Sequence, residues 1–203
     1  MPYTEENLNK ILAIRGIGEK TWPYWLEEWP ASYAMAEILE EIDFNLNQNL
    51  DQNDTNLPLS SARVLDLGSG SGFLAGFLKQ RFDFNVFSCD FNFDACHLTR
   101  HNASINLPFE HSASRTFCAD FTAFPMRKTF EFIFAGEMLY HPSLIDPILD
   151  FLKRFLSASG KAFLADRGRS SAAGFFDRAE KNGLQIKLFT KGNFHVYQVQ
   201  KIS

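Results

Sequence analysis

The sequence predicts an α/β protein with a doubly wound, mostly parallel sheet of seven strands and a helical cap at its N-terminus. Three observations lead to this fold class. Apolar segments of strand length alternate with helical segments from residue 62 onward, and the first of these strands runs directly into a glycine-rich loop. The last two apolar segments are separated by a short turn, which is typical of an antiparallel hairpin.

The 203 residues are long enough for one compact domain with a substantial core, which we expect to consist of two parts. Residues 1–61 are expected to form the cap and a polar connector, and residues 62–203 the core. The predicted elements of the cap are a helix, a tryptophan-rich segment and a second helix, at 4–14, 22–30 and 31–42. The polar, asparagine-rich composition of 45–61 is typical of a mobile connector.

In the core, strands alternate with helices, which indicates a sheet covered on both faces. Helices are expected at 73–81, where apolar residues follow a helical spacing, and at about 92–106. The hairpin turn is placed at Lys191-Gly192. The strands are predicted near 63–67, 85–90, 114–118, 130–135, 160–165, 184–190 and 193–200. In this topology the glycine-rich loop belongs at the switch point of the sheet, where ligands bind.

The loop after the first strand carries the strongest functional signal. Gly68, Gly70 and Gly72 alternate with serines, so a ligand can lie against bare backbone. Asp66 interrupts the apolar strand before them, and a carboxylate there is costly to bury without donors or a charged partner. No Gly-Lys-Ser/Thr follows the glycines, which excludes a phosphate-binding P-loop.

Two nucleotide cofactors remain for this loop. Gly70, Gly72 and Ala75 match the relaxed dinucleotide pattern, but Asp66 would place a negative charge beside a pyrophosphate. S-adenosylmethionine carries a positive sulfur and an ammonium group, both of which favour a nearby carboxylate. The loop therefore predicts an S-adenosylmethionine site; the alternative is a structural strand-turn-helix with chance glycines.

Two further acids follow the next strands. Asp90 ends the second strand, 18 residues past Gly72, near the spacing at which an acid binds a ribose diol. It could equally cap the helix at about 92–106, and both roles can hold at once. Asp120 and Phe121 follow the third strand and suit an adenine, the acid on its amino edge and the ring on its face.

These features resemble the class I S-adenosylmethionine-dependent methyltransferases, which have a Rossmann-like fold, across nearly all of 62–203. The glycine loop, Asp90 and Asp120 match the cofactor motifs of that family in order. The resemblance implies that S-adenosylmethionine is the cofactor. It also implies that Trp29 lies on the cofactor side, whereas Trp22 and Trp25 are more typical of anchors for the cap.

A narrower resemblance is carried by three motifs, Trp22-Pro-Tyr-Trp25 with Glu28-Trp29-Pro30, Gly136-Glu-Met-Leu-Tyr140 and Asp166-Arg-Gly-Arg169. They look like motifs of the seven-strand protein lysine methyltransferases, in particular those that act on the electron-transfer-flavoprotein β-subunit and their bacterial relatives. Those proteins usually carry Asp-x-x-Tyr and Asp-Pro-Gly-Arg at the last two places. Here Glu137, which reaches further, and Arg167, which lacks the stiffness of proline, stand instead.

The resemblance implies roles for the residues after strands four and five. Glu137 and Tyr140 are expected to hold the hydrogens of an acceptor amine and to steady the developing ammonium; the alternative is a turn cap and a packed ring. His141 could serve as a base or be a turn residue before Pro142. Arg167 and Arg169 are expected to grip an acidic protein surface, or else to belong to a solvated loop.

Whole-chain properties narrow the partners. A net charge of −4 speaks against a large nucleic-acid footprint, and the Asn/Asp-Pro-Pro-aromatic motif of nucleic-acid amino-methyltransferases is missing after strand four. A protein acceptor is favoured. A small-molecule acceptor, a nucleic-acid acceptor, which is the less favoured of these two, and a cofactor-binding module without turnover stay open. The cysteines and histidines lack metal-ligand spacing, and no transmembrane run or lipidation motif occurs. We therefore expect a soluble cytoplasmic protein with reduced thiols and no metal.

Overall fold

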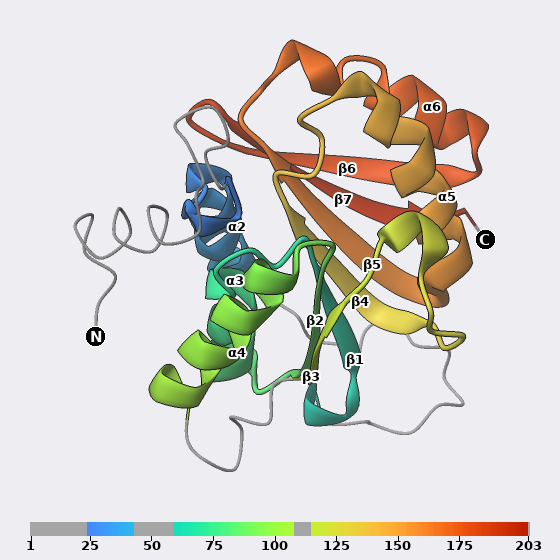
Figure 1. The fold of residues 1–203 in the computed structure, drawn as a ribbon. Coiled ribbons are helices and arrows are strands. Elements are labelled where there is room, and N and C mark those ends of the chain that lie inside the picture. Colours follow the sequence, from blue (N-terminus) through green and yellow to red (C-terminus); the bar gives the residue numbers. More distant parts are fainter. Residues whose placement is uncertain (1–23, 43–58, 108–114, 203) are drawn as a thin grey trace.

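The computed structural model describes residues 24–42, 59–107 and 115–202. In these residues the chain forms an α/β fold around one sheet of seven strands (Figure 1). The predicted helix at 4–14, Trp22 and most of the connector at 45–61 lie outside the described residues.

The sheet has the order β3-β2-β1-β4-β5-β7-β6. All neighbouring pairs from β3 to β5 are parallel, and β7 is antiparallel to both β5 and β6. The predicted fold class, including the C-terminal hairpin, is confirmed. The strands are β1 (Arg63–Leu67), β2 (Asn85–Asp90), β3 (Arg115–Cys118), β4 (Phe130–Gly136), β5 (Leu156–Asp166), β6 (Leu184–Lys191) and β7 (Phe194–Lys201).

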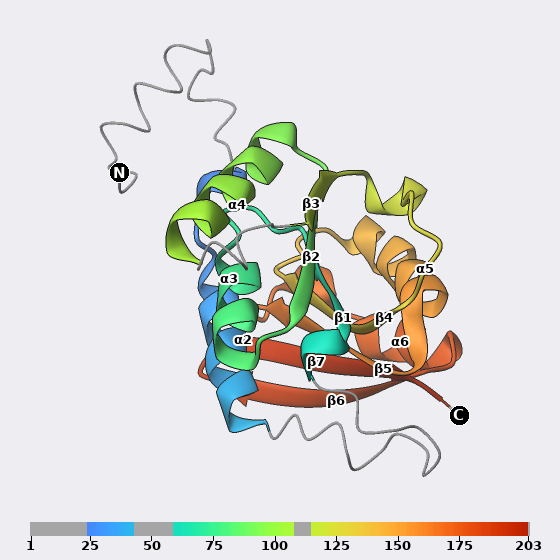
Figure 2. The ribbon, with the colours of Figure 1, turned by 90° about the horizontal axis from the view of Figure 1, so that it is seen from below.

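Helices cover both faces of this sheet (Figures 1 and 2). On one face lie α2 (Pro30–Glu41), α3 (Phe73–Phe82) and α4 (Phe93–Asn106). On the other face lie α5 (Ile145–Phe155) and α6 (Phe175–Lys181). Because β1 continues into α3 on one face and β4 leads to α5 on the other, the chain reverses its direction of winding between these central strands. Their carboxyl ends therefore form the topological switch point.

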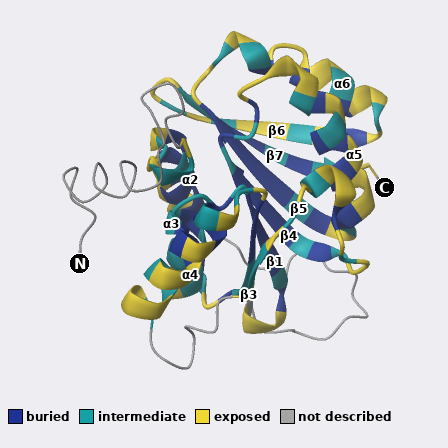
Figure 3. Cartoon of the chain, viewed as in Figure 1, coloured by how far each residue is buried: buried dark blue, intermediate teal, exposed yellow. Residues whose placement is uncertain are grey.

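Side chains that alternate along the central strands build two apolar layers. On β1, Val64 packs with α2 and α3, whereas Leu65 packs with α5. Figure 3 shows the resulting band of buried residues along the sheet. Phenylalanine fills much of both layers, and the fully buried rings include Phe84, Phe130, Phe134, Phe163 and Phe175.

Two boundaries differ from the sequence prediction. The fifth strand begins at Leu156 rather than 160, because a register shift in β4 lets Phe130 pair with Leu156 ahead of the regular ladder. The hairpin turn is Gly192-Asn193 rather than Lys191-Gly192, because Lys191 still pairs with Phe194. Gly192 has a φ of 57° at the first turn position, where type II′ turns take glycine.

Candidate active site

A pocket lies at the carboxyl ends of β1 and β4, under the segment that leads into α2. Four of the predicted site residues, Trp29, Asp66, Gly68 and Gly70, line it. The remaining lining residues are Glu27, Glu28, Ser32, Ser69, Ser71, Phe73, Leu74 and Gly136. We refer to residues 24–29 as the cap segment.

The charged side chains that line the pocket are all acidic. Glu27 and Glu28 come from the cap segment and Asp66 from β1, and no lysine, arginine or histidine is among the lining residues. Glu28 accepts a hydrogen bond from the Tyr33 hydroxyl. Carboxylates and exposed backbone without a cation favour a positively charged ligand over a phosphate.

Asp66 is the most deeply buried of these three acids. Its side chain is buried, and its Oδ2 atom has no hydrogen-bond partner in the described residues. Burial and the neighbouring charge of Asp90 raise the pKa of Asp66 to about 7, although the Ala75 backbone N–H opposes this shift. Buried polar atoms are rarely left without a partner. An ammonium or sulfonium group in this pocket would supply the missing interaction, so the site fits S-adenosylmethionine.

The glycine loop is held by its backbone. Gly70 has a φ of 49°, and its N–H donates to Asp90 Oδ2 over 3.0 Å. A Cβ atom at Gly70 would lie 3.2 Å from the Trp25 carbonyl oxygen, so the cap segment passes directly over the loop. The Thr99 hydroxyl donates to the Gly70 carbonyl from α4 at 3.0 Å and completes the frame.

Gly72 lies outside the pocket lining, at the N-cap of α3 with a φ of 81°. A Cβ atom there would come within 2.9 Å of Thr99 Cγ2 and 3.0 Å of Thr99 Cα. The small residue is thus required by the close packing of the loop against α4. A direct contact of Gly72 with the cofactor stays a prediction.

Asp90 is buried at the end of β2 and accepts backbone hydrogen bonds from both sides. Besides Gly70, the Asn92 N–H donates to its Oδ1 over 2.9 Å. Burial raises the pKa of Asp90, and these backbone donors counter the rise. The alternative that Asp90 caps α4 is wrong: Asn92 is the N-cap and accepts from the N–H groups of Asp94 and Ala95. Asp90 therefore links the glycine loop to β2.

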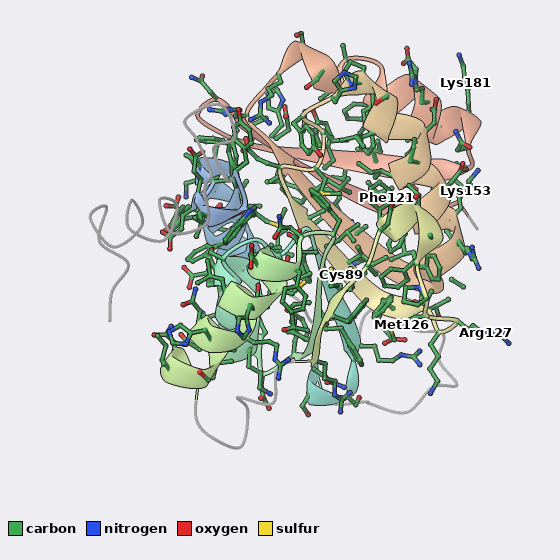
Figure 4. All side chains as sticks on the ribbon, in the orientation of Figure 1. Cys89, Phe121, Met126, Arg127, Lys153 and Lys181 are labelled. Atoms are coloured by element: carbon green, nitrogen blue, oxygen red, sulfur yellow. The ribbon has the colours of Figure 1, made fainter. Side chains whose placement is uncertain are left out.

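Asp120 and Phe121 follow β3 but do not line the pocket. Asp120 is exposed and accepts from the Thr122 N–H and hydroxyl at 2.8 Å each, which lowers the pKa of its carboxyl. The Phe121 ring, labelled in Figure 4, packs edge-on against Phe151 of α5 with 6.0 Å between ring centroids. The contacts of Asp120 and Phe121 with the adenine of the cofactor therefore stay a prediction.

Glu137 directly follows β4 and adopts a left-handed backbone, with a φ of 60°. Its N–H donates to the Ala165 carbonyl over 3.0 Å, which holds this unfavourable conformation. The side chain is only 3% exposed. Burial raises the pKa of Glu137, and the guanidinium groups of Arg169 and Arg167 oppose the rise.

The two arginines of the loop after β5 surround this carboxylate. Arg167 Nε and Arg169 Nη1 each lie 3.4 Å from Glu137 Oε1. Buried Asp166 accepts from the Arg169 N–H over 2.7 Å. Both guanidinium groups also lie over the Trp29 ring, 5.4 and 5.7 Å from its centroid. The two departures from the resembled motifs, Glu137 and Arg167, are thus ion-paired with each other.

Tyr140 and His141 lie beyond this cluster. The Tyr140 ring is 55% exposed, so its hydroxyl is open to a large acceptor. His141 Nδ1 accepts from the Ser143 N–H over 3.2 Å and caps the turn Pro142–Leu144. Of the two roles considered for His141, a base or a turn residue, the structure supports the turn residue.

Sequence reasoning missed the acids and small residues beside its predicted sites. Ser69 and Ser71 were readable as the spacers of the glycine loop, and Gly136 as the end of strand four. Glu27, Glu28 and Ser32 carry no motif of their own, and only the folding of the cap segment over the loop brings them to the pocket. Among the described residues, no group of acids, histidines and cysteines could hold a metal ion, and no helix has the length and apolar character to cross a membrane.

Comparisons with known proteins agree with this geometry. The sequence profile of a family described as "Methyltransferase domain" matches residues 64–160. A TehB-like SAM-dependent methyltransferase from Corynebacterium glutamicum is similar over 97% of this chain and 95% of its own, at 17% identity and a TM-score of 0.56. A ribosomal protein L11 methylase from Lactobacillus delbrueckii subsp. bulgaricus is similar over 70% of each chain, at 18% identity and a TM-score of 0.60.

The glycopeptide N-methyltransferase MtfA in complex with S-adenosylmethionine is similar over 84% of this chain and 94% of its own, at 10% identity and a TM-score of 0.62. No curated protein matches the sequence. Residues 64–160 match the methyltransferase domain family, and the neighbouring structures share the Rossmann-like fold, which indicates an S-adenosylmethionine-dependent methyltransferase with S-adenosylmethionine as its cofactor. The finer resemblance to the electron-transfer-flavoprotein lysine methyltransferases stays a prediction.

Proposed function

We propose that the protein transfers a methyl group to a side-chain nitrogen of a protein, with lysine as the favoured acceptor. The observation that carries this proposal is the position of Glu137. It follows Gly136, which lines the pocket, and its carboxylate is buried. This carboxylate would stabilise an amine that becomes positively charged during methyl transfer. Arg167 and Arg169 favour its ionised form, which is the form that stabilises an ammonium.

The remaining roles follow from the same pocket. Trp29, Asp66, Gly68, Gly70 and Asp90 would hold S-adenosylmethionine, which supplies an activated methyl group on a positively charged sulfur. Asp66 offers its unpartnered oxygen to a cationic group, and the glycine loop offers bare backbone. Methyl transfer depends mainly on positioning, so the chain needs to align the acceptor and exclude water.

Tyr140 completes the acceptor side of this proposal. Its exposed ring stands three residues after Glu137, and its hydroxyl can accept or donate one hydrogen bond to an amine. An exposed position suits an acceptor that belongs to a macromolecule rather than one enclosed in a small cavity.

The proposal is tested by incubating the protein with methyl-labelled S-adenosylmethionine and a cell lysate. We expect label in the protein fraction, recovered as methyllysine after acid hydrolysis. A Gly70→Leu protein serves as the control without cofactor. Label that appears only in small molecules or in nucleic acid would reject the protein acceptor, and label on another side chain would reject lysine.

A further inference from the structure

The cap segment is the part of the pocket wall that is least anchored in the core. Helix α2, which follows it, buries Ala31, Met35 and Leu39 against the sheet and α3. The cap segment itself has no buried residue. It forms a short turn, Tyr24–Leu26, and Trp29 Nε1 donates back to the Tyr24 carbonyl over 3.1 Å. The segment therefore holds together locally and lies over the glycine loop without a fully buried residue of its own.

Trp29 makes the main contact between the cap segment and the acceptor side. Its ring stacks on Tyr24 with 6.2 Å between centroids, and it faces Arg167 and Arg169 at 5.4 and 5.7 Å. Trp29 also precedes Pro30, the first residue of α2, and its carbonyl accepts from the Ser32 N–H. A cation over an aromatic face is attractive but weak when solvent reaches it, so such contacts form and break easily.

Two buried acids form ion pairs with these arginines. Glu137 pairs with both guanidinium groups, and Asp166 binds the backbone and the side chain of Arg169. The two acids and two arginines balance in charge. Yet Glu137 Oε1, Asp166 Oδ1 and Arg169 Nη1 all lack a hydrogen bond of good geometry. The cluster is held by ion pairs and by a hydrogen bond of 3.4 Å that Arg169 Nη2 donates to Glu137 Oε2.

We propose that Arg167 and Arg169 are positioning residues that act through Trp29: they latch the cap segment over the cofactor pocket and so set how fast the cofactor binds and leaves. The proposal goes beyond the assigned acceptor, because it concerns cofactor exchange alone. It also gives Arg167, which pairs with Glu137, a role besides the predicted grip on an acidic protein surface.

A latch differs kinetically from a direct contact. If the cap segment must open for exchange, weakening the latch raises the association and the dissociation rate constants together, with little change in affinity. A lost contact with the bound cofactor raises the dissociation rate constant alone. Rate constants for the cofactor therefore distinguish a latch from a direct cofactor contact, and no methyl acceptor is needed for the measurement.

The experiment measures both rate constants for S-adenosylhomocysteine by surface plasmon resonance on the full-length protein. The variants are Arg167→Gln, whose side chain is partly exposed, Trp29→Leu and Trp29→Phe, each checked for folding by circular dichroism. Arg154→Gln is the matched control, because Arg154 lies 4.9 Å over the Phe155 ring at the far end of α5. We expect both rate constants to rise about three- to tenfold in Arg167→Gln. In Trp29→Leu both should also rise, the dissociation rate constant more, because Trp29 lines the cofactor pocket as well. Trp29→Phe, which keeps a ring, should show smaller changes.

The double variant Arg167→Gln/Trp29→Leu decides whether the two residues act as one unit. We expect its association rate constant to match that of each single variant and its dissociation rate constant to match that of Trp29→Leu, with Arg154→Gln unchanged from the wild type. Additive effects on the association rate constant, unchanged rate constants, or a rise in dissociation alone in Arg167→Gln would each overturn the latch. If Trp29→Leu does not fold, Arg167→Gln and Trp29→Phe still decide by the same criterion. None of these outcomes depends on the acceptor, so the failure of the lysine proposal would leave the result intact.

Discussion

In the proposed function the site has a cofactor side, which is the pocket, and an acceptor side beside it around Glu137. Both sides bury carboxylates, but different groups bind them. On the cofactor side, Asp90 is bound by the backbone N–H groups of Gly70 and Asn92. On the acceptor side, Glu137 is bound by the side chains of Arg167 and Arg169. One side is a backbone frame, and the other is a network of long side chains.

This difference teaches where the site is rigid and where it adjusts. Backbone donors cannot move without breaking the strand register that places them, so the cofactor side is fixed once β1 and β2 pair. Arginine side chains rotate freely at a loop and can exchange partners. Changes on the cofactor side should therefore abolish binding, whereas changes on the acceptor side should alter rates.

The largest effect is expected from Gly70→Leu. The side chain would meet the Trp25 carbonyl and occupy the space of the cofactor, while the φ of 49° disfavours any residue but glycine. Calorimetry with S-adenosylhomocysteine should detect no binding. The control is Gly76→Ala on α3, where a Cβ atom meets nothing within 4 Å and binding should persist. Wild-type affinity in a folded Gly70→Leu protein would remove the loop from the site.

The next largest effect separates chemistry from binding. Glu137→Gln should lower single-turnover methyl transfer about a hundredfold at saturating cofactor, because a neutral amide stabilises a developing ammonium far less than a carboxylate does. Cofactor affinity should change little, and Tyr140→Phe should lose less activity. Glu131→Gln is the matched control, since Glu131 pairs with Arg63 at the other end of β4. Wild-type turnover in Glu137→Gln would show that the acceptor is held elsewhere.

A smaller loss is expected from Asp90→Ala. The variant removes an acceptor of two backbone hydrogen bonds and the proposed ribose contact, so affinity for S-adenosylhomocysteine should fall about ten- to a hundredfold. Asn92→Ala removes the true cap of α4 instead and should cost about 1 kcal/mol of stability with affinity retained. Equal losses of affinity in both variants would assign the effect to the helix rather than to Asp90.

The smallest expected effect depends on pH. With its pKa raised to about 7, Asp66 is mostly protonated at pH 6 and mostly ionised at pH 8. Because a cationic ligand prefers the ionised form, affinity for S-adenosylmethionine should rise about tenfold over this range in the wild type. Calorimetry of Asp66→Asn should show a flat profile, and an unchanged slope would mean that another group titrates.

The same shift predicts the stability of the cofactor-free protein. The folded state keeps its proton on Asp66 up to a pH of about 7, whereas an unshifted carboxyl releases it near 3.8. The folded state therefore binds more protons between these values, and the free energy of unfolding falls as the pH rises through this window, by at most about 1.4 kcal/mol per pH unit for one proton. Denaturant titrations of Asp66→Asn should lack this fall.

Much of the cofactor side could be predicted from the sequence, because its signals are local. Glycines that need a positive φ, an acid before them and a second acid one strand later are all tied to backbone positions at strand ends. Asp66, Gly68 and Gly70 accordingly meet in one pocket. The packing role of Gly72 was not predictable, because it depends on how closely α4 approaches the loop. The cap of α4 is a local interaction, but its assignment to Asn92 rather than Asp90 depends on the residue at which the helix begins.

The acceptor side was decided by tertiary structure. The sequence by itself determined that Glu137 and Arg167 follow the fourth and fifth strands, and with them the edge of the sheet on which both residues lie. Only the fold decided that they pair, that Glu137 takes a left-handed backbone, and that Trp29 from 138 residues earlier in the chain covers both arginines. The physical reason is that hydrophobic period and turn chemistry act between neighbours in the chain, whereas charge neutralisation depends on distances in space between the ends of different elements.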